Sequence, residues 1–497
     1  MRATPPPARR RAGAVAGLAV AAGGGLALAA CGPDDVVVAP VIDGPAAGSD
    51  AAAFPDLDEL VITLARAGST ADLLSATFTR GQTVELRGAP EGDELVVHLT
   101  GRLGGQEVAY GRTCAFALRA GEPPPAPHLW FARTVKWGEL DASPAPVRRD
   151  GRAVAYRDGS ALFVGGHDAA GEPVTAVERF DPRAGALTTV ADLAPRRAPV
   201  VASLGDGRLL VAGGIDGASD TASDRLEVLE LDVTGAGRVD TFVDQRLARA
   251  GATAVTLTDG RVVIFGGGAV TGPPLAAPVE IAADGATVAV RDLRAAMAVP
   301  RRGATATRLS DDLGAPVLVS GGVDLDGQPV ALAELWRPLR EDFADPQAFA
   351  PAMRVPRHRH AAPRMPDGSV LVIGGLDAAG QPVRALELFT LDGGFVDAGL
   401  LPPGAGVVDA TVTALPDGRI LVAGGRETAD GEPVQGGFIV NLDPLDGSVD
   451  AISTDRLERV RAGHAATALC DGTIVVLGGT ELASPVERYS PPPLGRR

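Results

Sequence analysis

The chain has 497 residues, a formal net charge of −16 and 45% hydrophobic residues. It is longer than one ordinary hydrophobic core supports, so we expect either several domains or one large closed repeat array. The acidic balance excludes broad binding to nucleic acid or to anionic membranes, because such surfaces need a positive field. Any site for an anion must therefore be local.

Residues 1–30 have the features of an export signal. Arginines near the start precede an apolar, small-residue stretch that is too short and too rich in glycine to span a membrane. The segment Leu28-Ala29-Ala30-Cys31 resembles the bacterial lipoprotein box. That resemblance implies that Cys31 is diacylated and becomes the mature N-terminus, and Gly32 favours the outer membrane, on its periplasmic or its cell-surface side. The alternative is a plain secretory signal in which Cys31 is incidental.

The next two segments differ in pattern. Residues 31–54 are rich in Pro, Ala and Gly and lack an apolar period, which indicates a lipidated flexible tether. Residues 55–134 contain short alternating segments, such as 60–64 and 95–99, separated by glycine-containing turns. Several short strands at this spacing predict a small β-sandwich, immunoglobulin-like in shape.

Residues 135–497 repeat with a period near 50. Seven glycine pairs each close a short run of Val, Leu, Ile or Phe, at steps of 48 to 55 residues. In every repeat but the fourth, an Asp-Gly dipeptide lies seven residues before the pair, which indicates a hairpin between two strands. A later strand carries a recurrent glutamate, replaced by Phe438 in the sixth repeat. These features fall at Gly165, Gly213, Gly266, Gly321, Gly374, Gly424 and Gly478 for the pairs, and at Glu178, Glu227, Glu280, Glu334, Glu387 and Glu487 for the glutamates.

Together these motifs resemble kelch repeats. The resemblance implies a seven-bladed β-propeller with one four-stranded blade per repeat, an architecture that leaves only short sheet edges. The last repeat ends before a fourth strand, and Trp137 precedes the first repeat. We therefore expect residues 135–140 to supply the outer strand of the seventh blade. A sandwich followed by such a propeller is similar to the galactose-oxidase-like architecture.

Arginines recur at the start of the first strand of the repeats. Two interpretations are open for them: hydrogen bonds to carbonyls and carboxylates inside the propeller, or a positive face that binds a carboxylate- or phosphate-bearing polymer or an acidic protein loop. Val407 takes the position in the sixth repeat. These candidate ligand-binding residues are Arg148, Arg196, Arg249, Arg302, Arg357 and Arg461.

The remaining reactive side chains predict no metal or cofactor. Cys114 and Cys470 fall in different domains, so we expect buried free thiols rather than a disulfide. His360 and His464 occupy the same repeat position, which indicates packing rather than metal binding. Carboxylates such as Asp324 are interpreted as polar turn residues rather than as Ca²⁺ ligands.

A copper-radical oxidase, resembling galactose oxidase, would need two tyrosines, two histidines and a cysteine, but the chain has only Tyr110, Tyr156 and Tyr489. We therefore expect a protein that is not an enzyme. The prediction is a monomeric, lipid-anchored cell-envelope protein that binds or scaffolds an unidentified protein or acidic polysaccharide, and no nucleic acid, through a propeller face. The alternatives are a carbohydrate-oxidising or sugar-epimerising propeller enzyme and a structural spacer.

Overall fold

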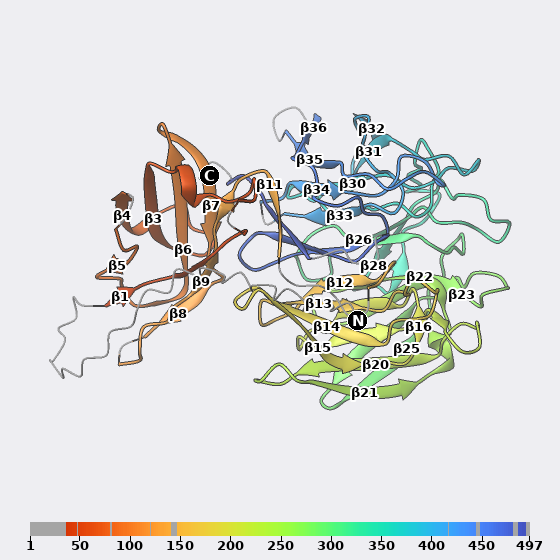
Figure 1. Cartoon of the computed structure of the whole chain (residues 1–497). Coiled ribbons are helices and arrows are strands. Elements are labelled where there is room, and N and C mark those ends of the chain that lie inside the picture. The colour runs from red at the N-terminus through yellow and green to blue at the C-terminus, as the bar shows by residue number, and fades with distance from the viewer. Residues whose placement is uncertain are drawn as a thin grey trace, which may run out of the picture.

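The computed structural model describes residues 36–493, except 47, 80–81, 120, 141–146, 416, 444–447 and 481–485. Apart from the 3₁₀ turns η1 (Phe54–Asp56) and η2 (Gln245–Leu247), its regular elements are all strands. They form a smaller sandwich and a larger propeller, which lie side by side (Figure 1). Within the described ranges, no helix has the length and apolar character needed to cross a membrane. The expected signal and Cys31 lie outside the described residues.

The N-terminal domain is a β-sandwich built on one antiparallel sheet with the order β10-β7-β6-β3-β4, and β8 also pairs with β6. Two short pairs, β1 with β5 and β2 with β9, cover this sheet, and residues of both layers meet in one apolar core. The strands are β1 (Val37–Val38), β2 (Val41–Asp43), β3 (Glu59–Arg66), β4 (Asp72–Thr79), β5 (Leu86–Arg87), β6 (Gly92–Leu103), β7 (Gln106–Arg112), β8 (Phe116–Leu118), β9 (His128–Trp130) and β10 (Ala132–Arg133).

The expected tether over residues 31–54 is wrong for the part that the structure describes. Val38 in β1 is fully buried in the sandwich core, and β2 runs parallel to β9 with Ile42 opposite Leu129. The turn η1 then packs Phe54 against Phe131, with ring centroids 5.0 Å apart. The β-branched residues of this segment favour strands, and the surrounding Pro and Gly obscured that signal in the sequence.

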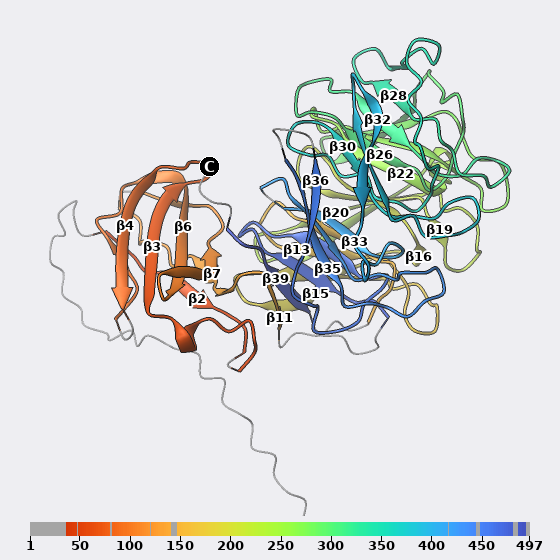
Figure 2. The ribbon, with the colours of Figure 1, turned by 90° about the horizontal axis from the view of Figure 1, so that it is seen from above.

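The propeller consists, among the described residues, of seven antiparallel sheets that follow one another in the sequence. The innermost strands contact their counterparts in neighbouring blades, and the chain moves outward through each blade. Figure 2 shows the domain from above, with the sandwich beside it. Blades one to three are β12 (Arg152–Ala155), β13 (Ala161–Val164), β14 (Ala176–Asp181), β15 (Ala186–Asp192); β17 (Val200–Ser203), β18 (Leu209–Ala212), β20 (Arg225–Leu231), β21 (Gly237–Val243); and β22 (Ala250–Thr256), β23 (Val262–Gly268), β24 (Val279–Asp284), β25 (Thr287–Asp292).

The remaining blades follow the same order, and blade five has three strands because isolated bridges replace its innermost strand. The short pair β16 (Arg196–Arg197) and β19 (Ile215–Asp216) extends blade two at its loops. Blades four to seven are β26 (Thr305–Arg308), β27 (Val317–Ser320), β28 (Glu334–Arg337), β29 (Asp342–Phe343); β30 (Val370–Val372), β31 (Ala385–Thr390), β32 (Gly394–Leu400); β33 (Thr411–Ala414), β34 (Ile420–Ala423), β35 (Gly437–Leu442), β36 (Val449–Ser453); and β37 (Ala465–Ala468), β38 (Ile474–Leu477), β39 (Glu487–Ser490), β11 (Lys136–Glu139).

The seventh blade joins the two ends of the propeller. β11 pairs with β39, which places Trp137 opposite Tyr489, and both side chains are buried. Their ring centroids are 4.8 Å apart. The closing strand therefore lies where the sequence predicts it, and the chain passes from β10 of the sandwich to this strand through Thr134 and Val135.

The double glycines allow the blades to approach closely. Gly321 and Gly322 have φ values of +61° and +85°, which favour glycine. A Cβ on Gly321 would lie 2.3 Å from the His360 ring of the next blade, and one on Gly322 would lie 2.5 Å from the carbonyl oxygen of Arg302. Glycine is required here by both backbone conformation and space.

The sandwich is fixed to blade seven by a disulfide between Cys114 and Cys470, with Cα atoms 5.0 Å apart. The expectation of two free thiols is therefore wrong, because residues 356 positions apart meet across the domain interface. Beside the disulfide, the Arg488 guanidinium stacks over the Trp130 ring at 4.7 Å and pairs with Asp471. Arg488 is buried, so this contact is part of the interdomain core.

Candidate functional site

Buried arginine–glutamate pairs connect the start of the innermost strand to the third strand in five blades. In each, the arginine also donates to backbone carbonyls, as Arg357 does to Gly374 and Ala385. Burial lowers the pKa of Arg357, and the Glu387 carboxylate opposes that shift. The pairs are Arg148–Glu178, Arg196–Glu227, Arg301–Glu334, Arg357–Glu387 and Arg461–Glu487.

Blades three and six depart from this scheme. In blade six both partners are apolar, Val407 and Phe438, and both are buried. In blade three the register between the second and third strands is shifted by one residue, so Val279 occupies the position of the glutamates. A shift of one residue turns a side chain to the opposite face. Glu280 accordingly pairs with Arg261 and Arg291, not with Arg249.

Arg249 is thus a buried cation without a carboxylate. It donates to the carbonyls of Arg246 and Gly266, and no ion pair involves it in the part of the chain that the structure describes. Burial lowers its pKa to about 10.

Arg302 does not occupy the repeat position expected for it. The turn in the fourth repeat is longer than in the others, and the structure gives the position to Arg301, one residue earlier. Arg302 lies at the loop surface, where its guanidinium holds the blade-three loop through carbonyls such as those of Ala269 and Val270. The other five candidate arginines are buried, with contacts of the structural kind, and ligand binding by them stays a prediction.

The surface next to the buried arginines has a different character. Strand direction places the loops between the second and third strands on the same side as the crossovers between blades, and we call this side the mouth face. Two positions after each buried arginine, or after Val407, the backbone has positive φ in all seven blades. The seven residues are Asp150, Ala198, Gly251, Gly303, Arg359, Asp409 and Gly463, with φ between +45° and +71°.

Three of these residues carry charged side chains although glycine suits the conformation. Holding a non-glycine residue there costs on the order of 1 kcal/mol. The three are Asp150, Arg359 and Asp409, and they lie on one side of the ring. Asp150 N–H donates to Gly463 O at 2.7 Å, and Gly463 N–H donates to Asp409 O at 2.9 Å.

Further charged groups surround these three. Arg359 pairs with Asp409, and Arg426 also contacts Asp409 at 3.3 Å. His167 Nδ1 lies 3.7 Å from an Asp150 oxygen. The Asp150 carboxylate and the Arg359 guanidinium are each more than half exposed. We call Asp150, His167, Arg359, Asp409 and Arg426 the charged arc.

The charged arc borders a polar hollow of about 520 Å³ between the loops of blades six and seven. Arg426 and Thr480 lie in its wall, and Asp430 and Glu432 add carboxylates. The sequence analysis missed this arc because it followed the arginines that recur from repeat to repeat. The sequence does contain a signal for the arc: two residues after the recurrent arginine, some repeats have Asp or Arg where others have Gly.

The histidines and turn carboxylates have structural contacts. His360 and His464 are buried, and each bonds a threonine of the preceding blade, Thr305 at 3.1 Å and Thr411 at 2.9 Å. Burial lowers the pKa of both imidazoles to about 3. Asp324 accepts backbone N–H groups of its own turn. Within the described ranges, no group of three or more His, Cys, Asp or Glu side chains could hold a metal ion.

The fold and this face define a seven-bladed, kelch-like β-propeller with an N-terminal sandwich. No protein-family model matches the chain, and no curated protein matches it. Among solved structures, it is similar to a fungal alcohol oxidase of the AA5 family in complex with copper, at 17% identity and a TM-score of 0.51, covering 72% of this chain and 76% of the oxidase. It also matches YjhT at 14% identity and a TM-score of 0.46, covering 63% of this chain and 99% of YjhT.

The comparison with the oxidase corrects one expectation. The prediction that the protein is not an enzyme is contradicted, because a catalytic protein shares the fold, and the fold cannot exclude catalysis. The copper site itself does not fit the residues described. Tyr489 packs in blade seven, Tyr110 lies in the sandwich beside His98, and Cys470 is in the disulfide.

Proposed function

We propose that the protein is an exported, envelope-associated propeller that binds a protein partner on its mouth face. The observation that carries the proposal is the charged arc, where Asp150, Arg359 and Asp409 keep charged side chains in a backbone conformation that favours glycine. The Asp150 and Arg359 side chains are more than half exposed, and a role for them at the surface accounts for the unfavourable backbone conformation.

The rest of the mouth face supports a protein rather than a polymer. Over blades three and four the loops expose Val270, Leu275 and Leu325, which we call the apolar sector. Protein interfaces combine an apolar centre with charged groups at the edge. A surface that places an apolar sector beside a charged arc has this composition, whereas a repetitive acidic polysaccharide has no use for the apolar part.

Export and lipid attachment at Cys31 belong to the same proposal. The signal and lipoprotein box of the sequence support them, and the Cys114–Cys470 disulfide supports an oxidising compartment. The same proposal takes the protein to be a monomer.

The test is capture of proteins from detergent-solubilised envelope by the mature protein, compared with a D150N/R359S variant at low and high salt. We expect the variant to capture at least tenfold less of the partner than the wild-type protein does. Arg238→Ser is the control, because Arg238 is also more than half exposed but lies on outer strand β21, away from the mouth face. Equal capture by all three proteins would contradict the proposal.

A second candidate is acid–base conversion of a carbohydrate, as in a sugar-epimerising enzyme. It is favoured by the exposed Asp150 carboxylate beside the His167 imidazole on the mouth face, where the two could exchange a proton with a bound sugar. The test is proton exchange or epimer interconversion in a panel of monosaccharides, followed by NMR. Turnover that His167→Asn abolishes would support it, and no turnover of any sugar in the panel would contradict it.

A further inference from the structure

The strands around the axis of the propeller differ from the rest of the chain in charge. The protein has a net charge of −16, yet the described innermost strands contain no carboxylate, and neither do residues 361–364, which take that place in blade five. Most of their side chains are those of Ala, Val and Thr. Three cations stand among them: Arg152 in β12, Arg308 in β26 and Arg364 in blade five.

Arg308 and Arg364 share one carboxylate at the end of the ring away from the mouth face. Arg308 Nη2 lies 2.7 Å from one Asp311 oxygen, and Arg364 pairs with the other oxygen. Hydrogen bonds from Arg364 and Arg308 hold the pKa of the Asp311 carboxyl below its ordinary value. Both guanidinium groups are therefore engaged within the protein.

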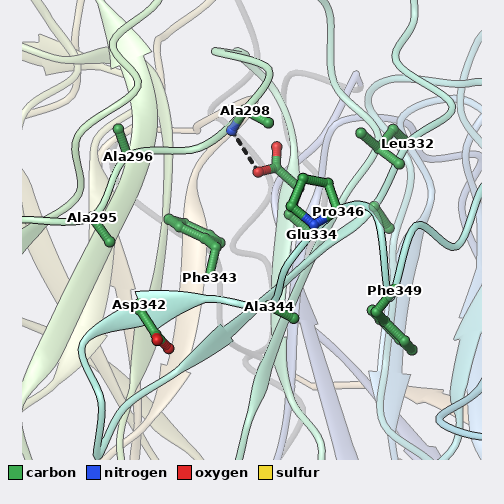
Figure 3. Close-up of a pocket in the computed structure, with 11 residues that line it drawn as sticks. Ala295, Ala296, Ala298, Leu332, Glu334, Asp342, Phe343, Ala344, Pro346 and Phe349 are labelled. Atoms are coloured by element: carbon green, nitrogen blue, oxygen red, sulfur yellow. Dashed lines mark hydrogen bonds between the residues drawn. The ribbon is translucent and has the colours of Figure 1, made fainter.

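The recurrent arginines inside the blades are engaged as well. In blade four Arg301 pairs with Glu334 at 2.6 Å, and Glu334 also accepts Ala298 N–H at 2.6 Å in the wall of a cavity of about 330 Å³ (Figure 3). The same pair occurs in four other blades. Arg249 has no carboxylate, but it is buried and donates to backbone carbonyls. These arginines are all buried, so they present no accessible guanidinium to a ligand.

Arg152 differs because it is exposed and at the same time surrounded by protein. The residue is exposed to solvent, yet burial lowers the pKa of its guanidinium, and the Asp150 carboxylate opposes that shift. Both observations fit a side chain of an innermost strand that reaches solvent at the axis of the ring, with blades on every side. Among the described residues Arg152 forms no hydrogen bond or ion pair, and Asp150 acts on it from beyond ion-pair distance.

The side chains at the level of Arg152 in the ring are short and uncharged. Its strand, β12, contacts β17 of blade two and β37 of blade seven. No carboxylate at this level of the described ring competes for the guanidinium. From blade two to blade seven, the residues at the same repeat position are Val200, Thr253, Thr305, Ala361, Thr411 and Ala465.

We propose that Arg152 makes the axis of the propeller a binding site for a small oxyanion, either a carboxylate or a phosphate. The planar guanidinium presents N–H donors that match two oxygens of such a group. Its attraction for an anion is stronger than at an open surface, because the surrounding protein displaces part of the water. The site goes beyond the proposed function, since it needs no protein partner.

Chemical modification of the wild-type protein tests accessibility and binding together. Phenylglyoxal modifies accessible guanidinium groups, and peptide mass spectrometry gives the rate at each arginine. We expect Arg152 to react and the buried Arg357 to stay unmodified. Inorganic phosphate or succinate, added at constant ionic strength, should slow the reaction of Arg152 at least fivefold and that of the exposed Arg238 less than twofold. The anion that protects identifies the ligand class, whereas an unreactive Arg152, or one that neither anion protects, would overturn the site.

Titration calorimetry with the protecting anion then compares variants. Arg152→Gln should weaken binding at least tenfold, and the control Arg238→Gln less than twofold. Asp150→Asn removes the negative charge that acts on Arg152, so it should tighten binding at least twofold. Binding that Arg152→Gln leaves unchanged, or that Asp150→Asn weakens, would overturn the assignment. The proposed function predicts the opposite sign, a loss of partner capture in D150N/R359S, so the two proposals fail separately.

Discussion

Arg357 and Glu387 lie 2.6 Å apart inside blade five, with their side chains 0% and 2% exposed. The carboxylate also accepts the backbone N–H groups of Arg354 and Val355, which begin the path into the innermost strand. The pair therefore ties the crossover from one blade to the third strand of the next. The same Arg–Glu pair occurs in five blades. Blades three and six lack it, and substitutions that imitate them test how much the pair contributes to stability.

Removing one partner of this pair should be costly. Arg357→Met leaves the Glu387 carboxylate buried without its cation, and we expect a loss of about 3–5 kcal/mol in the free energy of unfolding. Urea denaturation followed by tryptophan fluorescence measures it. The double variant R357V/E387F imitates Val407 and Phe438 of blade six and should recover most of the loss. A double variant as unstable as the single one would contradict this account.

Arg249 should behave differently from Arg357. Arg249→Met removes a buried cation that has no carboxylate partner, so no charge is stranded. We expect its destabilisation to be at least about 2 kcal/mol smaller than that of Arg357→Met. The same denaturation experiment compares the two substitutions, which change side-chain volume equally. Equal losses would show that the carbonyl contacts, rather than the carboxylates, decide the stability.

The buried histidines predict a loss of stability in acid. Their pKa values in the fold are about 3, against an ordinary 6.5, so between these values the unfolded chain binds protons that the fold does not. Their contribution is complete above pH 6.5 and decreases as the pH falls toward 3, at roughly 1.4 kcal/mol per pH unit for each histidine. His360→Gln keeps a donor for Thr305 and should reduce the slope of unfolding free energy against pH by close to one proton. An unchanged slope would contradict the burial of a neutral ring.

Loss of the disulfide should destabilise the junction between the domains. Because the bond closes a loop of 356 residues, the chain-entropy estimate is about 6 kcal/mol, and residual structure in the unfolded chain lowers it. We expect C114S/C470S to unfold at a lower temperature by differential scanning calorimetry, with the sandwich melting separately from the propeller. A single unshifted transition would show that the Arg488 and Trp130 contact is sufficient.

The sequence predicted the architecture because the repeat itself carries it. Glycine pairs, Asp-Gly turns and Trp137 each have one physical use in a propeller, and together they specified blade number and closure. The sequence-based prediction of pairing residues was wrong where the register between strands determines which side chain faces inward. One residue separates Arg302 from Arg301 and Glu280 from the position of Val279, and counting along a repeat cannot detect a shift that hydrogen bonding between strands creates.

The functional surface was harder to predict for a different reason. The candidate arginines recur in most repeats, but this recurrence marks an internal contact that five blades share, and that contact is buried. The charged arc is irregular, since it appears in some blades only. The disulfide and the N-terminal strands depend on contacts between distant segments, and composition alone contains no information on those.

The pairing of Trp137 with Tyr489 sets the order in which the chain can be completed. β11 is made before the rest of the propeller, and its partner β39 follows only after more than 340 further residues. Until then β11 is a strand without its pairing partner, and its free backbone N–H and C=O groups can pair with other chains. Contacts of such high sequence separation form slowly. A growing chain cannot close the ring before β39 has been made, so chaperones that shield unpaired strands should raise the yield of folded protein.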